Sequence, residues 1–455
     1  MDGNFAPLSG ADLGSLLDRM SVASAAAPVP ALAVEARRRR PELTRFETHP
    51  LYRQMELQRA MAGFALVRDP YYRTHDVRAG ATTVIDGRAM VNFASYDYLG
   101  LNGHPDVIAA VESAVRTFGS SVSASRITAG ERSVHRALET ALATLYGAED
   151  AVVFVSGHAG AVSTLATLIG PKDLIVHDSL SHNCLVVGAK LSGAARRSFP
   201  HNDLDALDAL LDAERDRFER VMIVTEGLFS MDGDMPDLQR LIALKEEYSA
   251  ILMVDDAHGL GVLGDCGRGV FEAQGVDPCS VDLWLGTLSK TLVSCGGYVA
   301  GSRSVVDLLK HHAPSIVYSV GMPATAAAAA KAALDVMLRE PDRVARLREN
   351  GQRFHTLAKV AGLDFGASIG AAIAPVYVGE TVRALALAER LLARGINAFP
   401  IIPPGVPDGT ARLRFFISAD HTAEQIEAAV IATAEESANV ADLSAASVMS
   451  RVKGL

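Results

Sequence analysis

Several features that define common protein classes are absent from this sequence. Only four of the 455 residues are cysteines, and no two of them form a CxxC pair, so neither a disulfide framework nor a zinc site is expected. No run of about 18 apolar residues is present. The opening residues, MDGNFAPLSGADLG, lack the basic and apolar regions of a signal peptide. We therefore expect a soluble, cytoplasmic protein with no transmembrane segment and no metal site.

Positive charge is also scarce. The formal net charge is −10, whereas a nucleic-acid partner requires a surplus of clustered Lys and Arg, so no nucleic acid is expected among the partners. The one basic run, Arg37 to Arg40, lies in a segment, residues 1–45, that is rich in Ala, Pro, Ser and Arg. We expect this segment to be a flexible N-terminal arm with solvated arginines.

The sequence does contain a regular alternation. From about residue 105, short apolar runs alternate with helical stretches, which is typical of a mostly parallel sheet covered by helices, an α/β fold. The expected strands are 151–155, 173–178, 220–226, 250–256, 281–287 and 296–302. We expect a large α/β domain over 105–335, a smaller α/β domain over 336–455, and an N-terminal segment, 46–104, packed on the smaller domain.

Lys290 carries the strongest local signal. It follows the apolar run DLWLGT, next to Thr287, Ser289 and Thr291, where the carboxyl ends of parallel strands form a ligand crevice. A lysine at a strand end is usually a solvated charge. Three hydroxyls beside an amine instead suit a phosphorylated aldehyde, because the amine forms an imine and the hydroxyls donate to the phosphate.

A second signal is the segment Asp255-Asp256-Ala257-His258, which follows the apolar run ILMV. A carboxylate beside a pyridine nitrogen keeps that nitrogen protonated and makes the ring an electron sink, and a nearby imidazole can hydrogen-bond a phenolic oxygen. The simpler interpretation of two aspartates after a strand is a turn or a helix cap. Both interpretations stay open on this segment alone.

Three more polar clusters follow expected strands: Ser156-Gly157-His158, Ser181-His182-Asn183, and Thr225-Glu226-Gly227 with Ser230 shortly after. Backbone N–H groups at Gly157 and the helix after it would hold a phosphate, and His182 could lie over a cofactor ring. Each cluster alone is explained as a loop or cap. Five clusters at successive strand ends favour one shared site.

Two motifs suggest other functions and are disfavoured. Residues 259–264 match GxGxxG after a strand, but no helix is expected to begin there, so a dinucleotide site is not indicated. Asp178-Ser179-Leu180 matches a phosphopantetheine attachment triplet, but it lies between an expected sheet strand and His182 and not in a small helical bundle.

Longer motifs show a family resemblance over about residues 45–435. The segments VNFASYDYLGLNGHP, SVSASRITAGERSVHRALE, VTEGLFSMDGDMPDL, MVDDAHGLGVLG and GTLSK resemble the α-oxoamine synthases. The resemblance implies the fold of aspartate aminotransferase, pyridoxal-phosphate fold type I, in which the large domain binds pyridoxal 5′-phosphate. It also implies a homodimer that joins an amino acid to an acyl thioester with loss of carbon dioxide.

The resemblance assigns roles residue by residue. Lys290 matches the family's cofactor lysine, Asp255 the partner of the pyridine nitrogen, and His258 the group near the phenolic oxygen. His182 matches the histidine that stacks on the ring, and Arg414 the arginine that holds a substrate carboxylate. Ser319 is expected to reach the phosphate of the partner subunit. Further cofactor or substrate contacts are expected at Tyr96, Gly157, His158, Glu226, Ser230 and Thr287.

The sequence departs from the family pattern in places. Tyr96 stands where many members have Asn, His158 replaces a common aromatic residue, and Val320 replaces a Thr, which puts a cross-subunit phosphate contact in doubt. The segments FASYDYLG, FVSGHAG and LSGAARRSFPHND are most similar to polyketide-associated members, which implies an acyl donor bound to a carrier protein. The alternatives are sphingoid-base synthesis like that of serine palmitoyltransferase, another reaction of the same cofactor such as aldol cleavage, and a non-catalytic scaffold subunit.

Overall fold

The computed structural model describes residues 41–64 and 68–444. The arm expected at 1–45 therefore lies mostly outside the described residues, and so do Arg37 to Arg40. The chain divides into two units at residues 58 and 59, and both the sheets and the site belong to the second. The first described elements are η1 (Pro41–Thr44), η2 (Phe46–Thr48) and α2 (Pro50–Phe64).

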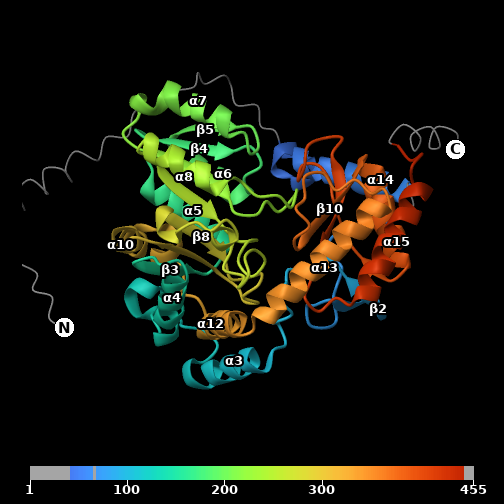
Figure 1. The fold of residues 1–455 in the computed structure, drawn as a ribbon, viewed down its shortest axis with the longest axis horizontal. Helices are drawn as coiled ribbons and strands as arrows, with labels where there is room; N and C mark the ends of the chain where they lie inside the picture. Colours follow the sequence, from blue (N-terminus) through green and yellow to red (C-terminus); the bar gives the residue numbers. More distant parts are fainter. Residues whose placement is uncertain (1–40, 65–67, 445–455) are drawn as a thin grey trace, which may run out of the picture. The chain divides into compact units, whose positions relative to one another are not determined.

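The largest sheet of the second unit has seven strands, in the order β3-β9-β8-β7-β6-β4-β5, and lies among the helices α4 to α10 (Figure 1). Strands β8, β7, β6, β4 and β5 run parallel to one another, and β9 is antiparallel to both of its neighbours. The strands are β3 (Asp150–Phe154), β4 (Leu174–Asp178), β5 (Ala195–Phe199), β6 (Val221–Glu226), β7 (Ile251–Asp255), β8 (Leu283–Thr287) and β9 (Gly297–Gly301).

Each face of this sheet packs against its own set of helices. Alternate residues of a strand point to opposite faces, so Val152 and Phe154 of β3 belong to one core and Ala151 and Val153 to another. The first core includes α5 (Gly157–Leu168), α6 (Asn183–Leu191), α10 (Arg303–His312) and α11 (Pro314–Val317). The second includes α3 (Pro105–Phe118), α4 (Ser133–Leu145), α7 (Leu204–Glu214), α8 (Leu238–Glu247), α9 (Val270–Ala273) and α12 (Ala324–Arg339).

Two three-stranded sheets accompany the large one. In the first, β13 lies between β10 and β12 and is antiparallel to both. In the second, β2 pairs with β1 and, in parallel, with β11, which joins the segment before residue 104 to the C-terminal part of the chain. The elements are β1 (Thr82–Ile85), β2 (Arg88–Asn92), β10 (Ile373–Gly379), β11 (Ile396–Asn397), β12 (Phe399–Ile401) and β13 (Ala411–Phe416), with helices α13 (Pro341–Val360), α14 (Thr381–Ala393) and α15 (Ala423–Asn439).

The fold class predicted from the sequence is confirmed. All six strands expected between 151 and 302 are present, and residues 259–264 form turns and not a helix. Strand β5 was not predicted, because its sequence, ARRSF, interrupts apolar residues with two arginines. Such charges suit the edge position that β5 occupies. The domain limits at 104 and 335 stay a prediction. Among the described helices, none is long and apolar enough to cross a membrane.

Candidate active site

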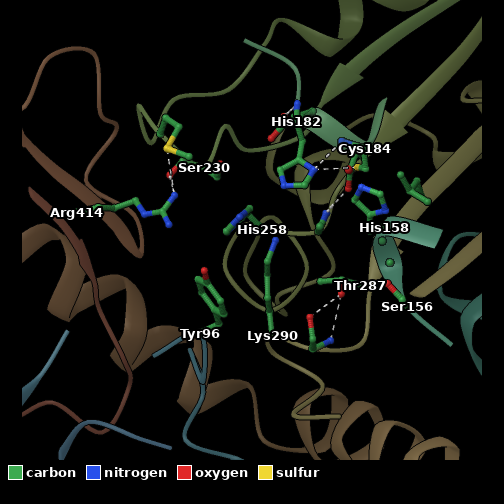
Figure 2. A pocket seen from close by; sticks show the side chains of 18 residues that line it. Tyr96, Ser156, His158, His182, Cys184, Ser230, His258, Thr287, Lys290 and Arg414 are labelled. Carbon is green, nitrogen blue, oxygen red and sulfur yellow. Dashed lines mark hydrogen bonds between the residues drawn. The ribbon is translucent and has the colours of Figure 1, made fainter. Parts of the chain in front are cut away.

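A cavity of about 350 Å³ lies at the carboxyl ends of the parallel strands (Figure 2). All but one of the predicted site residues line it, although they come from segments far apart in the chain. Those residues are Tyr96, Gly157, His158, His182, Glu226, Ser230, Asp255, His258, Thr287, Lys290 and Arg414. The exception is Ser319, which lies after α11 and donates a hydrogen bond to the carbonyl of Val320. Its predicted contact with a partner subunit stays a prediction.

One end of the cavity is suited to an anion. Ser156 is the N-cap of α5, so the free N–H groups of that helix begin at the cavity wall. The hydroxyl oxygens of Thr287 and Ser289 are 2.7 Å apart. A Cβ atom at Gly157 would lie only 3.1 Å from Thr287 Oγ1, so a larger residue there would narrow this end. Hydroxyls, helix N–H groups and close backbone approach together form a phosphate cradle.

Lys290 lies in a tight turn after β8 and is half-buried. Its side chain extends into the centre of the cavity, towards His258 and His182 (Figure 2). Burial lowers the pKa of Lys290 to about 8, although the negative charges of Asp255 and Glu226 oppose that change. The amine can therefore be neutral near physiological pH, the state in which it acts as a nucleophile or base.

Two carboxyl groups lie beside each other in the cavity wall. Asp255 ends β7 and Glu226 ends β6, and the two residues are direct partners in the parallel register, so their side chains leave the same face of the sheet. Burial, reinforced for Glu226 by the charge of Asp255, raises the pKa of Glu226 to about 8 and that of Asp255 to about 6. A buried carboxylate of this kind requires a cationic partner.

His258 is a neutral imidazole at the base of the cavity. Burial lowers its pKa well below the usual value for histidine, and the positive charge of Lys290 adds to this effect. Its Nδ1 atom lies 2.7 Å from the hydroxyl of Tyr98, which is itself buried. Its ring is also stacked on that of Phe416. These contacts fix the orientation of the imidazole and leave its other nitrogen for a ligand.

His182 precedes α6 and is held by Cys184. The Nδ1 atom of His182 accepts the backbone N–H of Cys184 at 3.3 Å and lies 2.9 Å from the Cys184 thiol. Burial and the charge of Lys290 lower the pKa of His182, so the ring is neutral. A neutral imidazole that accepts at Nδ1 carries its proton at Nε2. His182 therefore offers an N–H donor through Nε2.

Arg414 enters the cavity from β13 (Figure 2). One Nη atom donates to the carbonyl of Ser230 at 3.0 Å and contacts the sulfur of Met231 at 3.3 Å. The guanidinium lies over the ring of Phe416, 4.5 Å from its centroid. Its Nε is buried without a hydrogen-bond partner in the described part of the chain. Burial lowers the pKa of Arg414, yet arginine remains charged, so the cavity wall carries a positive charge that can pair with a carboxylate.

Sequence reasoning missed three residues of this arrangement. Cys184 and Met231 line the cavity, and Tyr98 holds His258 from behind. Cys184 lies two residues after His182, a spacing from which an N-cap contact could have been anticipated. Met231 follows Ser230 directly, but nothing in its residue type indicates a contact with an arginine. Tyr98 is separated from His258 by 160 residues, so only the fold brings them together.

These features fit pyridoxal 5′-phosphate. The cradle of Ser156, Gly157 and Thr287 suits its phosphate, Lys290 its aldehyde, and the buried acid of Asp255 its pyridine nitrogen. A large, mostly parallel sheet with a smaller C-terminal sheet completes the architecture. Fold and cavity together define a pyridoxal-phosphate enzyme of fold type I.

Comparison with known proteins identifies the family. The model for aminotransferase class I and II matches residues 88–432. An 8-amino-7-oxononanoate synthase of Geobacter sulfurreducens is 43% identical over 358 residues, which cover 78% of this chain and 90% of that protein. A serine palmitoyltransferase of Sphingomonas wittichii matches with a TM-score of 0.81 at 32% identity, over 87% of this chain and 98% of the other.

A second solved structure contains the cofactor. Serine palmitoyltransferase from S. paucimobilis with a bound PLP–myriocin aldimine matches with a TM-score of 0.83 at 28% identity, over 89% of this chain and 100% of the other. The chain belongs to the α-oxoamine synthases, within the class I and II aminotransferase family. It is a pyridoxal-phosphate-dependent acyltransferase, as the resemblance of its motifs predicted.

Proposed function

We propose that this enzyme condenses an amino acid with an acyl thioester and releases carbon dioxide, the free thiol and an α-amino ketone. The observation that carries the proposal is the combination, in one cavity, of the amine of Lys290, the acid of Asp255 and the guanidinium of Arg414. The relatives named 8-amino-7-oxononanoate synthase and serine palmitoyltransferase support the same type of reaction.

Each of four cavity residues has a separate role in this reaction. When bound, the cofactor supplies an electron sink for the charge that develops at the amino acid's α-carbon. Lys290 removes the α-proton, and Asp255 keeps the pyridine nitrogen protonated. His182 donates from Nε2 to the thioester oxygen as negative charge develops there. Arg414 holds the substrate carboxylate until it is lost as carbon dioxide.

Mass spectrometry of products tests the proposal directly. Purified enzyme is offered a panel of amino acids, including serine, alanine and glycine, with acyl thioesters of short to long chain length. We expect one pair to give an α-amino ketone with stoichiometric carbon dioxide and free thiol. Exchange of the α-proton for deuterium without any condensation product, or cleavage of a β-hydroxy amino acid, would instead assign another reaction of the same cofactor.

The panel also includes each acyl group on coenzyme A and on an acyl carrier protein. We propose a carrier-bound donor in a polyketide-type pathway, on the basis of the FASYDYLG and FVSGHAG segments and of the basic run Arg37 to Arg40. Carrier proteins are usually acidic, so arginines would raise the rate of association at low salt. We expect a higher kcat/KM for the carrier thioester, with a gap that narrows as salt increases. Equal use of coenzyme A thioesters would contradict the carrier proposal alone.

We also propose that the enzyme is a homodimer, as the family resemblance implies.

Replacing Arg414 by Lys should weaken amino acid binding selectively. Lysine keeps the charge but loses the planar, bidentate donors. A charged hydrogen bond contributes about 1.5–3 kcal/mol, so KM for the amino acid should rise by about tenfold to a hundredfold, while KM for the thioester stays unchanged. Steady-state kinetics with each substrate varied in turn checks this. The matched control is Arg339→Lys on the surface of α12, and an equal effect on both KM values would contradict the assignment.

A further inference from the structure

A cluster of charged residues around the half-buried His201 lies outside the set of residues that line the cavity. The Nδ1 atom of His201 is 2.9 Å from an oxygen of Asp178, and its Nε2 atom is 2.8 Å from an oxygen of Asp234. Both aspartates are buried. Carboxylate oxygens only accept hydrogen bonds, so both nitrogens of His201 donate. The ring is therefore an imidazolium that joins two acids.

Asp178 is the fixed end of this cluster. It is the last residue of β4 and is fully buried. Besides His201, its carboxylate accepts the backbone N–H groups of Leu180 and Asn202, each at 2.8 Å. These bonds hold the start of the loop that leads to His182. Asp178 is thus anchored to the large sheet whatever happens to His201.

Asp234, at the other end of the cluster, depends on His201 for its charged hydrogen bond. It closes the turn 229–234, in which Phe229 donates from its backbone N–H to the carbonyl of Asp234 at 2.9 Å. One carboxylate oxygen of Asp234 receives His201 and the side-chain amide of Asn202. The other oxygen is buried with no hydrogen-bond partner among residues 41–64 and 68–444. Without His201, a buried carboxylate would retain a single neutral donor, which is costly.

The same turn positions Arg414. Its residues Ser230 and Met231 supply the carbonyl and the sulfur that Arg414 contacts. The turn also binds Arg412, whose Nη1 donates to the carbonyl of Met231 at 3.1 Å. The turn is therefore held on one side by the two arginines of β13 and on the other by His201.

We propose that His201 is a positioning residue that ties the turn 229–234 to the end of β4 and thereby places Arg414 for the substrate carboxylate. This inference rests on the role of Arg414 given under the proposed function. His201 touches neither substrate nor cofactor and acts through Asp234, Ser230 and Arg414 in sequence.

The charge of His201 persists over the working pH range. Burial opposes that charge, but hydrogen bonds to Asp178 and Asp234 outweigh it and raise the pKa of His201 to about 10. The charged connection from Asp178 through His201 to Asp234 is therefore intact at pH values well below 10, and it weakens only as the pH rises through about 10. The ring of Phe229 lies edge-on to the imidazolium at a centroid distance of 4.5 Å, and it adds no charge to the surroundings of His201.

The test compares His201→Gln, which keeps one side-chain donor, with His201→Ala and with the control His311→Gln on the exposed end of α10. The holoenzyme of each variant is titrated with serine, alanine and glycine, and binding is followed by the change in the cofactor's absorbance. We expect the amino acid Kd to rise about tenfold in His201→Gln and more in His201→Ala, with KM for the thioester and cofactor content unchanged.

A double-mutant cycle separates positioning from a general loss of structure. If His201 acts through Arg414, His201→Gln should add little to the Kd of Arg414→Lys. Full additivity, an equal rise in the thioester KM, or a ¹⁵N spectrum in which the His201 ring loses a proton below pH 8 would overturn the inference. If wild-type holoenzyme responds to no amino acid, the proposed function fails instead. A normal wild-type response that His201→Gln leaves unchanged rejects only the role of His201.

Discussion

Replacement of Lys290 by Ala is expected to abolish turnover while the protein remains folded. Lys290 is the amine that faces the cofactor cradle, and we propose that it both attaches the cofactor and moves the α-proton. A positioned acid or base alone contributes about 10²–10⁴-fold to rate, and loss of covalent attachment adds to that. We therefore expect kcat to fall by at least about 10³-fold. Wild-type enzyme should absorb at about 420 nm, and the variant should lose that band.

Two measurements make the Lys290 prediction decisive. Borohydride reduction of the wild-type holoenzyme followed by peptide mapping should label Lys290, and label on any other lysine would refute the assignment. The control Lys172→Ala changes an exposed lysine paired with Glu219 and should leave rate and spectrum intact.

The pH dependence of α-proton exchange gives a further check on Lys290. A charged amine cannot accept a proton, so the rate of α-proton exchange should rise with pH and level off above about 8, the pKa to which burial lowers Lys290.

Asp255→Asn should reduce activity nearly as strongly, for a different reason. The amide has nearly the same shape as the acid but no charge, so the protonated pyridine nitrogen would lose its counter-ion. Removal of one partner from a buried ion pair costs about 3–5 kcal/mol, which corresponds to about 10²–10⁴-fold in kcat. Cofactor should still attach to Lys290, because the lysine and the phosphate cradle are unchanged.

The two readouts for Asp255→Asn are kcat and the absorbance of the bound cofactor. Activity should fall while the amount of bound cofactor stays near that of the wild type. Asp265→Asn is the matched control, because Asp265 is exposed and pairs with Arg348 at the surface. Wild-type kcat in Asp255→Asn would exclude Asp255 as the partner of the ring nitrogen.

How much could be predicted from the sequence depended on distance along the chain. Asp255 and Glu226 each end a mostly apolar strand and Lys290 follows another, so both the strand and the position at its end could be recognised locally. Arg414 could be placed only through a family motif, because its strand belongs to a different sheet. The contacts of Tyr98 with His258 and of His201 with Asp234 depend on how loops meet in space, which no local pattern encodes.

Strand β5 illustrates the same limit within the sheet. Its two arginines are incompatible with the apolar runs of central strands, and only its place at the edge of the sheet makes them acceptable. The role of LSGAARRSFPHND as a strand followed by the His201 loop therefore emerged from the structure and not from its residue pattern.

The order of strands has a consequence for how such enzymes can change. Asp255 ends β7 and Glu226 ends β6, and Lys290 lies in the turn after β8; these three strands are consecutive neighbours in the sheet. Neighbouring strands are about 4.8 Å apart, so the pairing of β7 with β6 fixes the separation between Asp255 and Glu226. That separation cannot change by small amounts without breaking backbone hydrogen bonds, and a one-residue shift would turn an acid to the opposite face. New substrate preferences should therefore arise through loop residues such as Tyr96 and Met231, while the two acids keep their spacing.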